Sequence, residues 1–464
     1  MAKRPLPHGP VLGFYGDDFT GSTDAMEILA LAGLDPILVT DIAHADQIKG
    51  LSECRAVGIA GISRSKPPAW MREHLPAAFG LLKNLGFPLC HYKVCSTFDS
   101  APHIGSIGCA LDIGREVFDQ AVVPIVVGVP DLGRYQAFGT LFARAGDVVH
   151  RLDRHPNMVR HPVTPMTEAD LRDHLAAQTS SPIALMNLVE MQADHATDIF
   201  RERLRGEAGA LFLDVIDEAT STAAGRLLWN EIPAPSFLVG SSGIEYALTR
   251  YWQSAGLLGP APQFAPAAEV GQIIVVSGSC SPATAAQIAW AQQNHFAALR
   301  IDSRRLLDGP DAAAAYLEGL AREARQALAR GRSILVFSAT GSDDPAIAAF
   351  ADSLRSRNLS LEDGNEKIGT ALAALLRLVL PHTDCRRVVV AGGDTSGRVV
   401  SDLGITSLRL KAPLVRGAPL CVTTGPEPWL EGLELVLKGG QVGRPDFLEM
   451  VRLGRDAGAL RAAG

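Results

Sequence analysis

The sequence lacks an uncharged apolar segment of about 18 residues, so it predicts no membrane span and no membrane partner. Its first residues, MAKRPLPH, do not contain the apolar core of a signal peptide, and the cytoplasm is therefore the expected location. There is also no basic run, because 43 lysines and arginines stand against 50 acidic residues, a formal charge of −7. This balance argues against nucleic-acid binding as the main role.

Cysteine is sparse and irregularly spaced. The seven cysteines are odd in number and show no paired CxxC spacing, which argues against a disulfide framework and against a structural zinc site. We expect most of them to be buried free thiols. Three histidines, His150, His155 and His161, lie close in the sequence but lack the spacing of a ligand set. The sequence therefore assigns no metal ligand.

The length and the pattern of apolar residues indicate the fold class. The chain has 464 residues, 47% of them hydrophobic, which is enough for two or three domains with a core each. Strand-like runs alternate with helical patterns from residues 11–15 and 22–32 onward, which predicts α/β domains, each with a mostly parallel sheet flanked by helices. A stretch rich in Pro, Gly and Ala at about residues 254–268 interrupts this alternation and is typical of a linker. We predict an N-terminal domain over 1–253, a linker over 254–270 and a C-terminal domain over 271–464.

The most informative motif is GGDTSG at residues 392–397, directly after the apolar run 387–391. Glycine lets backbone N–H groups approach a ligand, and Asp394, Thr395 and Ser396 are residue types that cap helices. A glycine turn that opens a helix can bind an anion, because free N–H groups and the helix dipole both point at the ligand. Taken alone, the motif fits an ordinary strand-to-helix turn equally well.

Two further glycine turns follow apolar runs in the same half of the chain. GSCSP at 278–282 combines Ser281, a good N-cap, with Pro282, which suits the first turn of a helix. KGGQVG at 438–443 places a cation and three glycines after a short strand. Ligands of open α/β sheets lie at the carboxyl ends of strands, so three such turns predict a nucleotide pocket. The chain lacks a GxGxxG followed by an acid about 20 residues later, which makes a dehydrogenase a weaker alternative.

Polar residues also follow strand-like runs in the first half. Asp17 and Asp18 come at the end of the first run, where one could orient a hydroxyl, accept its proton or hold Mg²⁺. Alternatively, one of them only caps the next helix. Near the end of the run 88–94, Lys93 offers a charge to a carboxylate or a phosphate. The residues next to it either contact a polyol or form a plain polar loop; they are Ser96, Thr97 and Asp99.

Two more positions complete the expected substrate site. Arg134 could form a bidentate pair with a substrate carboxylate, or else a surface salt bridge. Ser241 and Ser242 lie in a fourth turn, GSSG at 240–243, that could also bind an anion. Carboxylates, cations and hydroxyls together predict a pocket for a small hydroxylated acid.

Six motifs, in order along the chain, resemble those of the four-carbon acid sugar kinases, a family once grouped as a domain of unknown function. The resemblance runs nearly end to end and rests on DDFTGSTD at 17–24, KVCSTFDSAPHIG at 93–105, HPVTPM at 161–166, GSCSPAT at 278–284, GGDTSG at 392–397 and KGGQVG at 438–443. Any one of these motifs would be weak alone; their order makes them specific.

The resemblance implies an activity. It implies an N-terminal sugar-acid domain, a C-terminal nucleotide domain and an active site in the cleft between them. It further implies phosphorylation by ATP and Mg²⁺ of the terminal hydroxyl of threonate, erythronate or 3-oxo-tetronate. Positions that match the family motifs imply contacts with ATP at Ser279, Gly392, Gly393, Asp394, Thr395 and Gly440. We take Asp18 as the first candidate for the catalytic base and Asp394 as the second, since Asp394 could instead meet Mg²⁺.

Three departures from the family pattern bear on this reading. DLGRY at 131–135 stands in place of a GRTV-like stretch, which leaves the identity of the substrate open. RGAP at 416–419 replaces a PGxP stretch, and Val442 replaces a phenylalanine, but the phosphate glycines are intact. A non-catalytic module that senses a nucleotide or a sugar acid is the alternative function, and it would release no ADP. The expected partners are the sugar acid and ATP; a homodimer is left open.

Overall fold

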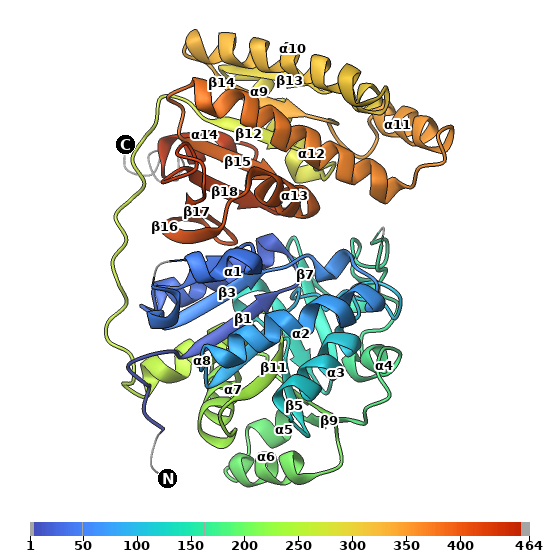
Figure 1. Cartoon of the computed structure of the whole chain (residues 1–464). Helices are drawn as coiled ribbons and strands as arrows, with labels where there is room; N and C mark the ends of the chain where they lie inside the picture. The colour runs from blue at the N-terminus through green and yellow to red at the C-terminus, as the bar shows by residue number, and fades with distance from the viewer. Residues whose placement is uncertain (1–3, 49, 162, 456–464) are drawn as a thin grey trace. The chain divides into compact units, whose positions relative to one another are not determined.

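A computed structural model describes residues 4–48, 50–161 and 163–455 (Figure 1). The described residues divide into two compact units. Unit 1 comprises those up to residue 37 and from 50 to 262, and unit 2 comprises 38–48 and those from 263 onward. Both units are α/β structures with mostly parallel strands, which confirms the predicted fold class.

Unit 1 contains a parallel sheet whose strands are nearly all buried. Such strands read as continuous apolar runs because helices cover both faces of the sheet. In spatial order the strands are β3 (Ala56–Ala60), β1 (Leu12–Gly16), β4 (Leu89–Lys93), β11 (Ser236–Gly240), β5 (Val123–Val126), β10 (Ala210–Leu213) and β9 (Ile183–Met186). The chain runs from β1 outward to β3 and then back past β1 to β4, so the strand order reverses at β1.

The helices of unit 1 follow from this reversal. Right-handed crossovers in opposite directions place helices on opposite faces of a sheet. Accordingly α2 (Pro68–Asn84) packs against α3 (Ile107–Phe118), whereas α8 (Gly243–Ser254) packs against α1 (Phe19–Leu31) and α7 (Glu218–Glu231), as Figure 1 shows. The shorter helices of this unit are α4 (Leu171–Ala176), α5 (Leu188–Met191) and α6 (Ala196–Arg205).

A small antiparallel sheet in unit 1 was not expected from the sequence. It consists of β6 (Arg134–Ala137), β7 (Thr140–Ala145) and β8 (Val148–Arg151). The turn from β6 to β7 places Phe138 and Gly139 at φ 52° and 80°, as a type I′ turn requires. Phenylalanine rarely adopts this conformation. Here the carboxylate of Asp214 accepts the N–H groups of both turn residues, so the turn is held by a residue distant in the sequence.

Unit 2 has a mixed sheet. The order is β13 (Phe296–Arg300), β14 (Ser333–Phe337), β12 (Ile274–Ser277), β15 (Arg387–Ala391), β18 (Glu434–Lys438), β17 (Ala418–Thr424) and β16 (Ser407–Val415). The first five are parallel, and β17 and β16 are antiparallel to their neighbours. One side carries α9 (Pro282–Gln293) and α14 (Phe447–Leu453). The other helices are α10 (Pro310–Ala329), α11 (Pro345–Arg355), α12 (Leu361–Val379) and α13 (Gly393–Leu403).

A short piece of the N-terminal half belongs to unit 2. Strand β2 (Ile37–Val39) pairs antiparallel with the start of β16, where Leu38 lies opposite Leu408 and Val39 opposite Ser407. Thr40 extends the contact, because its N–H donates to the carbonyl of Thr406 at 3.1 Å. The two units are therefore not consecutive stretches of the sequence.

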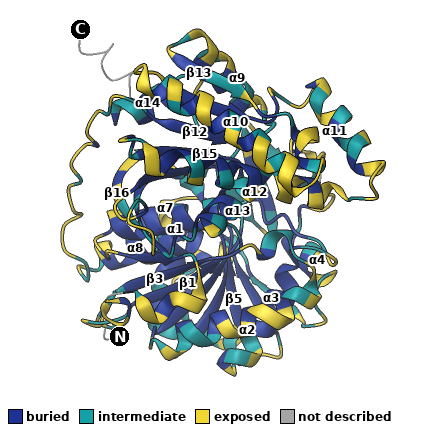
Figure 2. Cartoon of the chain, turned by 45° about the horizontal axis from the view of Figure 1, so that its top comes forward, coloured by how far each residue is buried: buried dark blue, intermediate teal, exposed yellow. Residues whose placement is uncertain are grey.

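Burial follows the layers of each unit. Figure 2 shows the strands in dark blue and exposed stretches on the outer sides of helices such as α2 and α10. The seven cysteines are free thiols, and four of them are buried, as expected. Within the described part of the chain, no helix combines the length and the apolar character needed to cross a membrane.

Candidate functional site

The site residues predicted in the first half follow the carboxyl ends of neighbouring strands in unit 1. Asp17 and Asp18 follow β1, Lys93 ends β4, and Arg64 lies in a short 3₁₀ turn, Ser63–Ser65, after β3. Because the strand order reverses at β1, the chain leaves β1 in opposite directions on its two sides. This is the place where open α/β sheets form their ligand crevice.

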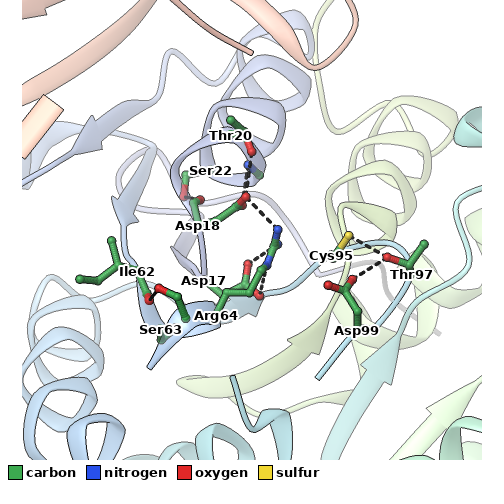
Figure 3. A network of polar contacts seen from close by, with 12 residues as sticks. Asp17, Asp18, Thr20, Ser22, Ile62, Ser63, Arg64, Cys95, Thr97 and Asp99 are labelled. Carbon is green, nitrogen blue, oxygen red and sulfur yellow. Dashed lines mark hydrogen bonds and ion pairs between the residues drawn. The ribbon is translucent and has the colours of Figure 1, made fainter. Parts of the chain in front are cut away.

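An arginine that the sequence analysis did not single out joins the two aspartates (Figure 3). Arg64 Nη2 donates to Asp17 Oδ1 at 2.6 Å, and Nε donates to Asp17 Oδ2 at 3.1 Å. Arg64 Nη1 donates to Asp18 Oδ2 at 2.8 Å. The signal was present in the sequence, since Arg64 follows the apolar run 56–60 just as Asp17 follows the first run. One guanidinium thus holds two adjacent carboxylates at the centre of the strand-end edge.

Asp18 also caps helix α1, the alternative role that the sequence predicts for one of the two aspartates. Its Oδ1 accepts the N–H of Gly21 at 2.7 Å, and its Oδ2 accepts the hydroxyl of Thr20 at 2.8 Å. The cap fixes the direction of the carboxylate without using all its lone pairs, because each carboxylate oxygen can accept two hydrogen bonds. Capping the helix and contacting a substrate hydroxyl are therefore compatible roles.

The buried carboxylates of this edge titrate differently. Burial raises the pKa of Asp17 to about 6, and the neighbouring Asp18 acts in the same direction, although Arg64 opposes both. Burial also disfavours the charged form of Asp99, but Arg64 and the Thr97 hydroxyl outweigh it and hold the pKa of Asp99 below its usual range. At neutral pH Asp17 is the better proton acceptor of these two groups, and Asp99 stays charged.

Lys93 is a buried cation close to the start of α1. Its side chain is 3% exposed, and within the described chain its ammonium forms neither an ion pair nor a hydrogen bond. A Cβ atom placed on Gly21 would lie 2.7 Å from Lys93 Nζ and 2.5 Å from Asp18 Oδ1. Glycine at position 21 therefore leaves the space in which these two opposite charges approach the helix.

Gly21→Ala is expected to lower kcat/KM for the sugar acid by about tenfold, because the added Cβ forces Asp18 and Lys93 to shift and so misplaces reacting groups. ATP affinity should not change. Steady-state kinetics measures both. Gly80→Ala is the matched control, since Gly80 is also helical and a Cβ there would meet nothing within 4 Å. Equal kinetics in the two variants would contradict the role of this space.

The residues that follow β4 form a compact polar turn. Thr97 Oγ1 donates to Asp99 Oδ1 at 2.6 Å and lies 2.9 Å from Cys95 Sγ (Figure 3). Thr97 and Asp99 are buried, whereas Ser96 is half-buried and its hydroxyl forms no hydrogen bond within the described chain. The structure thus brings Thr97 and Asp99 next to Arg64 and leaves Ser96 at the open side of the turn.

Arg134 is the first residue of β6, and Ser241 and Ser242 follow β11. Within the described chain none of these three forms a hydrogen bond or an ion pair with the group of Arg64, Asp17, Asp18, Thr97 and Asp99, called the Arg64 cluster below. Arg134 Nη1 donates to the carbonyl of Leu132 at 2.6 Å, while its buried Nε atom has no partner in the described chain. Ser241 Oγ donates to the carbonyl of Val127 at 2.7 Å, so this hydroxyl is engaged with the main chain. Ser242 is the N-cap of α8 without a side-chain cap bond. Arg134 Nε and the Ser242 hydroxyl, which form no hydrogen bond within the described chain, remain donors for a ligand.

Unit 2 brings its three glycine turns together. The strand order reverses between β12 and β15, and β18 is the neighbour of β15. A Cβ on Gly278 would lie 2.4 Å from Thr395 Oγ1, and one on Gly440 would lie 3.0 Å from Ser279 Oγ. The turn after β12 therefore touches both other turns. All the residues predicted to contact ATP belong to these turns.

The cap of helix α13 differs from the expectation. Asp394, Thr395 and Ser396 do not cap it, because the N-cap is Gly392 at φ 120° and the helix begins at Gly393. Gly392 has no side chain to bond the first N–H groups, and the first N–H bonded within the helix is that of Ser396, to the carbonyl of Gly392 at 2.9 Å. The N–H groups of Gly393 and Thr395 precede that bond, form no hydrogen bond within the described chain and remain donors for an anion. The prediction for α9 is confirmed, since Ser281 is its N-cap and Pro282 its first residue.

Metal binding has one candidate among these turns. No cluster of three or more His, Cys, Asp or Glu side chains suited to a metal ion occurs in the described residues. Mg²⁺ in nucleotide sites uses one or two carboxylates, with waters and phosphate oxygens as the other ligands. Asp394, exposed on the first turn of α13, is the carboxylate present in the three turns. The donor set fits an ion held mainly by the nucleotide.

Comparison with known proteins assigns the two halves. A family model described as a sugar-binding N-terminal domain matches residues 12–248, and one described as a nucleotide-binding C-terminal domain matches residues 274–448. A 3-oxo-isoapionate kinase of Paraburkholderia graminis is 48% identical over 98% of this chain and 96% of its own. A 3-oxo-tetronate kinase of Cupriavidus necator is 32% identical over 97% of this chain and 98% of its own. A crystal structure of a Haemophilus influenzae protein shares the fold, with a TM-score of 0.67, 24% identity and coverage of 95% and 99% of the two chains.

Proposed function

Because the chain belongs to the four-carbon acid sugar kinase family, we propose that it transfers the γ-phosphoryl group of ATP to a terminal hydroxyl of a 3-oxo sugar acid. It is an ATP-dependent sugar acid kinase. Among acids of the family, 3-oxo-isoapionate is our first candidate and 3-oxo-tetronate our second, since the relatives with these activities are 48% and 32% identical. Threonate and erythronate follow.

The observation that supports this proposal best is the pair of strand-end groups, one in each unit. Unit 1 offers acids beside cations, which suits a small hydroxylated anion. Unit 2 offers glycine turns in which the N–H groups of Gly393 and Thr395 form no hydrogen bond within the described chain, which suits phosphates. A kinase needs both chemistries, whereas a module that only binds needs one of them.

In unit 1 we assign the acceptor. Lys93 and Arg134 bind the carboxylate of the acid, because both are cations that form no ion pair within the described chain and Arg134 Nε is buried without a hydrogen-bond partner. Ser96, Thr97 and Asp99 contact its hydroxyls, with Asp17 completing the site beside Arg64. Ser242 contributes its N–H and its hydroxyl, which form no hydrogen bond within the described chain, and Ser241 positions that turn because its N–H and its hydroxyl both bond main-chain carbonyls.

In unit 2 we assign the donor. The N–H groups of Gly393 and Thr395, at the start of α13, bind the phosphates, Asp394 stands between them on the same turn, and Ser279, Gly392 and Gly440 form the turns around them. Mg²⁺ supplies charge neutralisation at the phosphates when bound, and Asp394 is the residue that would hold it.

Phosphoryl transfer is mainly positioning and charge stabilisation, so the chain must orient one hydroxyl and accept its proton. Asp18 accepts that proton: the cap of helix α1 and the hydrogen bond from Arg64 Nη1 fix the direction of its carboxylate. The cleft between the two domains, the linker at 254–270, the cytoplasmic location and a homodimer stay predictions.

The substrate proposal is tested by ATP-dependent ADP release with 3-oxo-isoapionate, 3-oxo-tetronate, threonate and erythronate. We expect the highest kcat/KM with 3-oxo-isoapionate, by at least about tenfold, because one altered group in a pocket changes kcat/KM by roughly 10–200-fold. A higher value with 3-oxo-tetronate would reverse the order of the first two candidates. Absence of ADP release with all four acids would favour the non-catalytic alternative.

A further inference from the structure

Lys438, the last residue of β18, is a fully buried cation in unit 2. Its side chain is 0% exposed. Its Nζ atom donates to Thr284 Oγ1 at 3.0 Å and lies 5.9 Å from the centre of the Phe447 ring. In the described chain no carboxylate forms an ion pair with this ammonium. Two of its three N–H donors have no acceptor among those residues.

Such a group is unfavourable unless something compensates it. Removing an ammonium from water without a counter-charge destabilises a fold, and an apolar residue of similar volume would pack at lower free energy. Burial alone lowers the pKa of Lys438 to about 8. The group is therefore still mostly charged at neutral pH. A buried positive charge without an acid is what an anionic ligand would complete.

The surroundings of Lys438 are the three glycine turns. Its carbonyl accepts the N–H of Gly392 at 3.0 Å, which ties it to the turn before α13. Its side chain reaches Thr284 on α9, whose Oγ1 donates to the carbonyl of Gly440 at 3.1 Å. Lys438 thus contacts the turn at 392–397 through its carbonyl, and through Thr284 it is linked to the turns at 278–282 and 438–443.

The start of helix α9 is hydrogen-bonded to the carbonyls of the turn at 438–443. Ser281, Thr284 and Gln287, spaced by three residues, all bond its carbonyls. Ser281 and Thr284 donate to Gly440, and Gln287 Nε2 donates to the carbonyls of residues 442, 443 and 444 at 2.9, 3.1 and 3.1 Å. With these carbonyls directed at α9, a shift of Thr284 moves the whole turn. The buried Lys438 Nζ donates to Thr284 Oγ1 and so helps to fix this side chain.

We propose that Lys438 is a positioning residue of the nucleotide site, which attracts the phosphates by its charge and fixes the glycine turn through Thr284. The proposal rests on the placement of the nucleotide at the three turns. Because the ammonium is covered, it acts through the turn rather than by direct contact. Its charge is effective there because a low-dielectric environment screens little.

The other titratable groups near Lys438 do not replace it in this role. Cys280 precedes α9, and burial raises the pKa of its thiol, so it is neutral. Arg444 and Asp446, before α14, form an ion pair with each other. Asp394 on α13 is exposed to solvent. Arg387 and Glu434, on β15 and β18, pair with each other at the opposite end of their strands.

The test compares ADP and adenosine binding by calorimetry in Lys438→Met and Thr284→Val. Methionine fills the lysine's volume without charge, and valine removes the hydroxyl while leaving the charge. We expect Lys438→Met to weaken ADP binding by at least about tenfold at pH 7.5 and to leave adenosine binding nearly unchanged. Thr284→Val should weaken ADP less.

The pH dependence separates charge from packing. Bound phosphates favour the protonated ammonium, so complex formation takes up a proton once the free lysine begins to lose it. ADP affinity of the unaltered protein should therefore fall as the pH rises above about 8, approaching tenfold per pH unit, and the Lys438→Met variant should lose this dependence.

Two outcomes would overturn the inference. Equal losses of ADP and adenosine in both variants, with no change in pH dependence, would make Lys438 a packing residue only. Unchanged ADP affinity in Lys438→Met would give it no role. If Gly393→Val abolishes ADP binding and one of these two outcomes is also observed, the nucleotide binds at the glycine turns without a contribution from Lys438. If Gly393→Val leaves ADP affinity intact, the placement of the nucleotide itself is wrong.

Discussion

Asp18→Asn is expected to lower kcat by about 10²-fold or more and to leave ATP affinity unchanged, because a positioned base contributes roughly that factor. Asparagine retains the shape of the side chain and is an equally good N-cap, so the bond to the Gly21 N–H is kept. What is lost is the ability to accept a proton from the substrate hydroxyl. Steady-state kinetics with the sugar acid and calorimetry with ATP measure the two quantities.

A matched control is available in the same unit. Asp170 also caps a helix, α4, and also pairs with an arginine, Arg172, but none of its hydrogen bonds involves the Arg64 cluster. Asp170→Asn should leave kcat within about twofold of the unaltered enzyme. A similar loss in both variants would mean that the effect comes from the cap rather than from the base.

Asp17 and Asp394 are the alternative candidates for the catalytic base. If Asp18→Asn keeps near-normal kcat and Asp17→Asn loses it, the base is Asp17, whose raised pKa makes it a competent acceptor near neutral pH. If Asp394→Asn loses kcat without loss of ATP affinity, the base comes from unit 2. We expect Asp394→Asn to weaken nucleotide or Mg²⁺ binding instead.

Gly393→Val is expected to weaken ATP binding by at least about 100-fold, because it blocks several hydrogen bonds to charged phosphate groups, each worth ~1.5–3 kcal/mol. Gly393 is the first residue of α13 and is half-buried. A branched side chain at this first helical position is expected to crowd the N–H groups to which a phosphate would bind. Calorimetry with ATP measures the loss, and the thermal unfolding midpoint should change little.

Ala346→Val is the control for this substitution. Ala346 is also half-buried in the first turn of a helix of unit 2, α11, but its N–H is already bonded by the carboxylate of Asp344 at 3.0 Å. ATP affinity should be unaffected there. Undiminished ATP affinity in Gly393→Val would move the nucleotide away from α13. A large fall in its unfolding midpoint would instead make the loss of binding a folding effect.

The parts of the fold that the sequence predicts are those whose signal is local. The strands around Val389 and Val275 are buried on both faces and so read as unbroken apolar runs. The start of α9 is readable because Ser281 and Pro282 each fit one position of a helix terminus. Strand ends then point to Asp18 and Gly393, since a parallel sheet brings its carboxyl ends to one edge.

The parts that could not be predicted depend on distant residues. The β6–β7 turn places Phe138 in a conformation that Asp214 stabilises from 76 positions away. Arg64 was overlooked although it follows a strand, because no motif marked it as the partner of two aspartates. The burial of Lys438 depends on how α9 and α14 cover it, which no local pattern reveals.

The pairing of β2 with β16 limits how the two halves of the molecule could be exchanged between relatives. A hybrid that takes residues from 263 onward from one protein and the rest from another would also combine a foreign segment 38–48 with β16. A C-terminal half expressed by itself would leave Ser407 and Leu408 at an open sheet edge, which favours association between chains. The unit that recombination can move intact is therefore the C-terminal half together with residues 38–48.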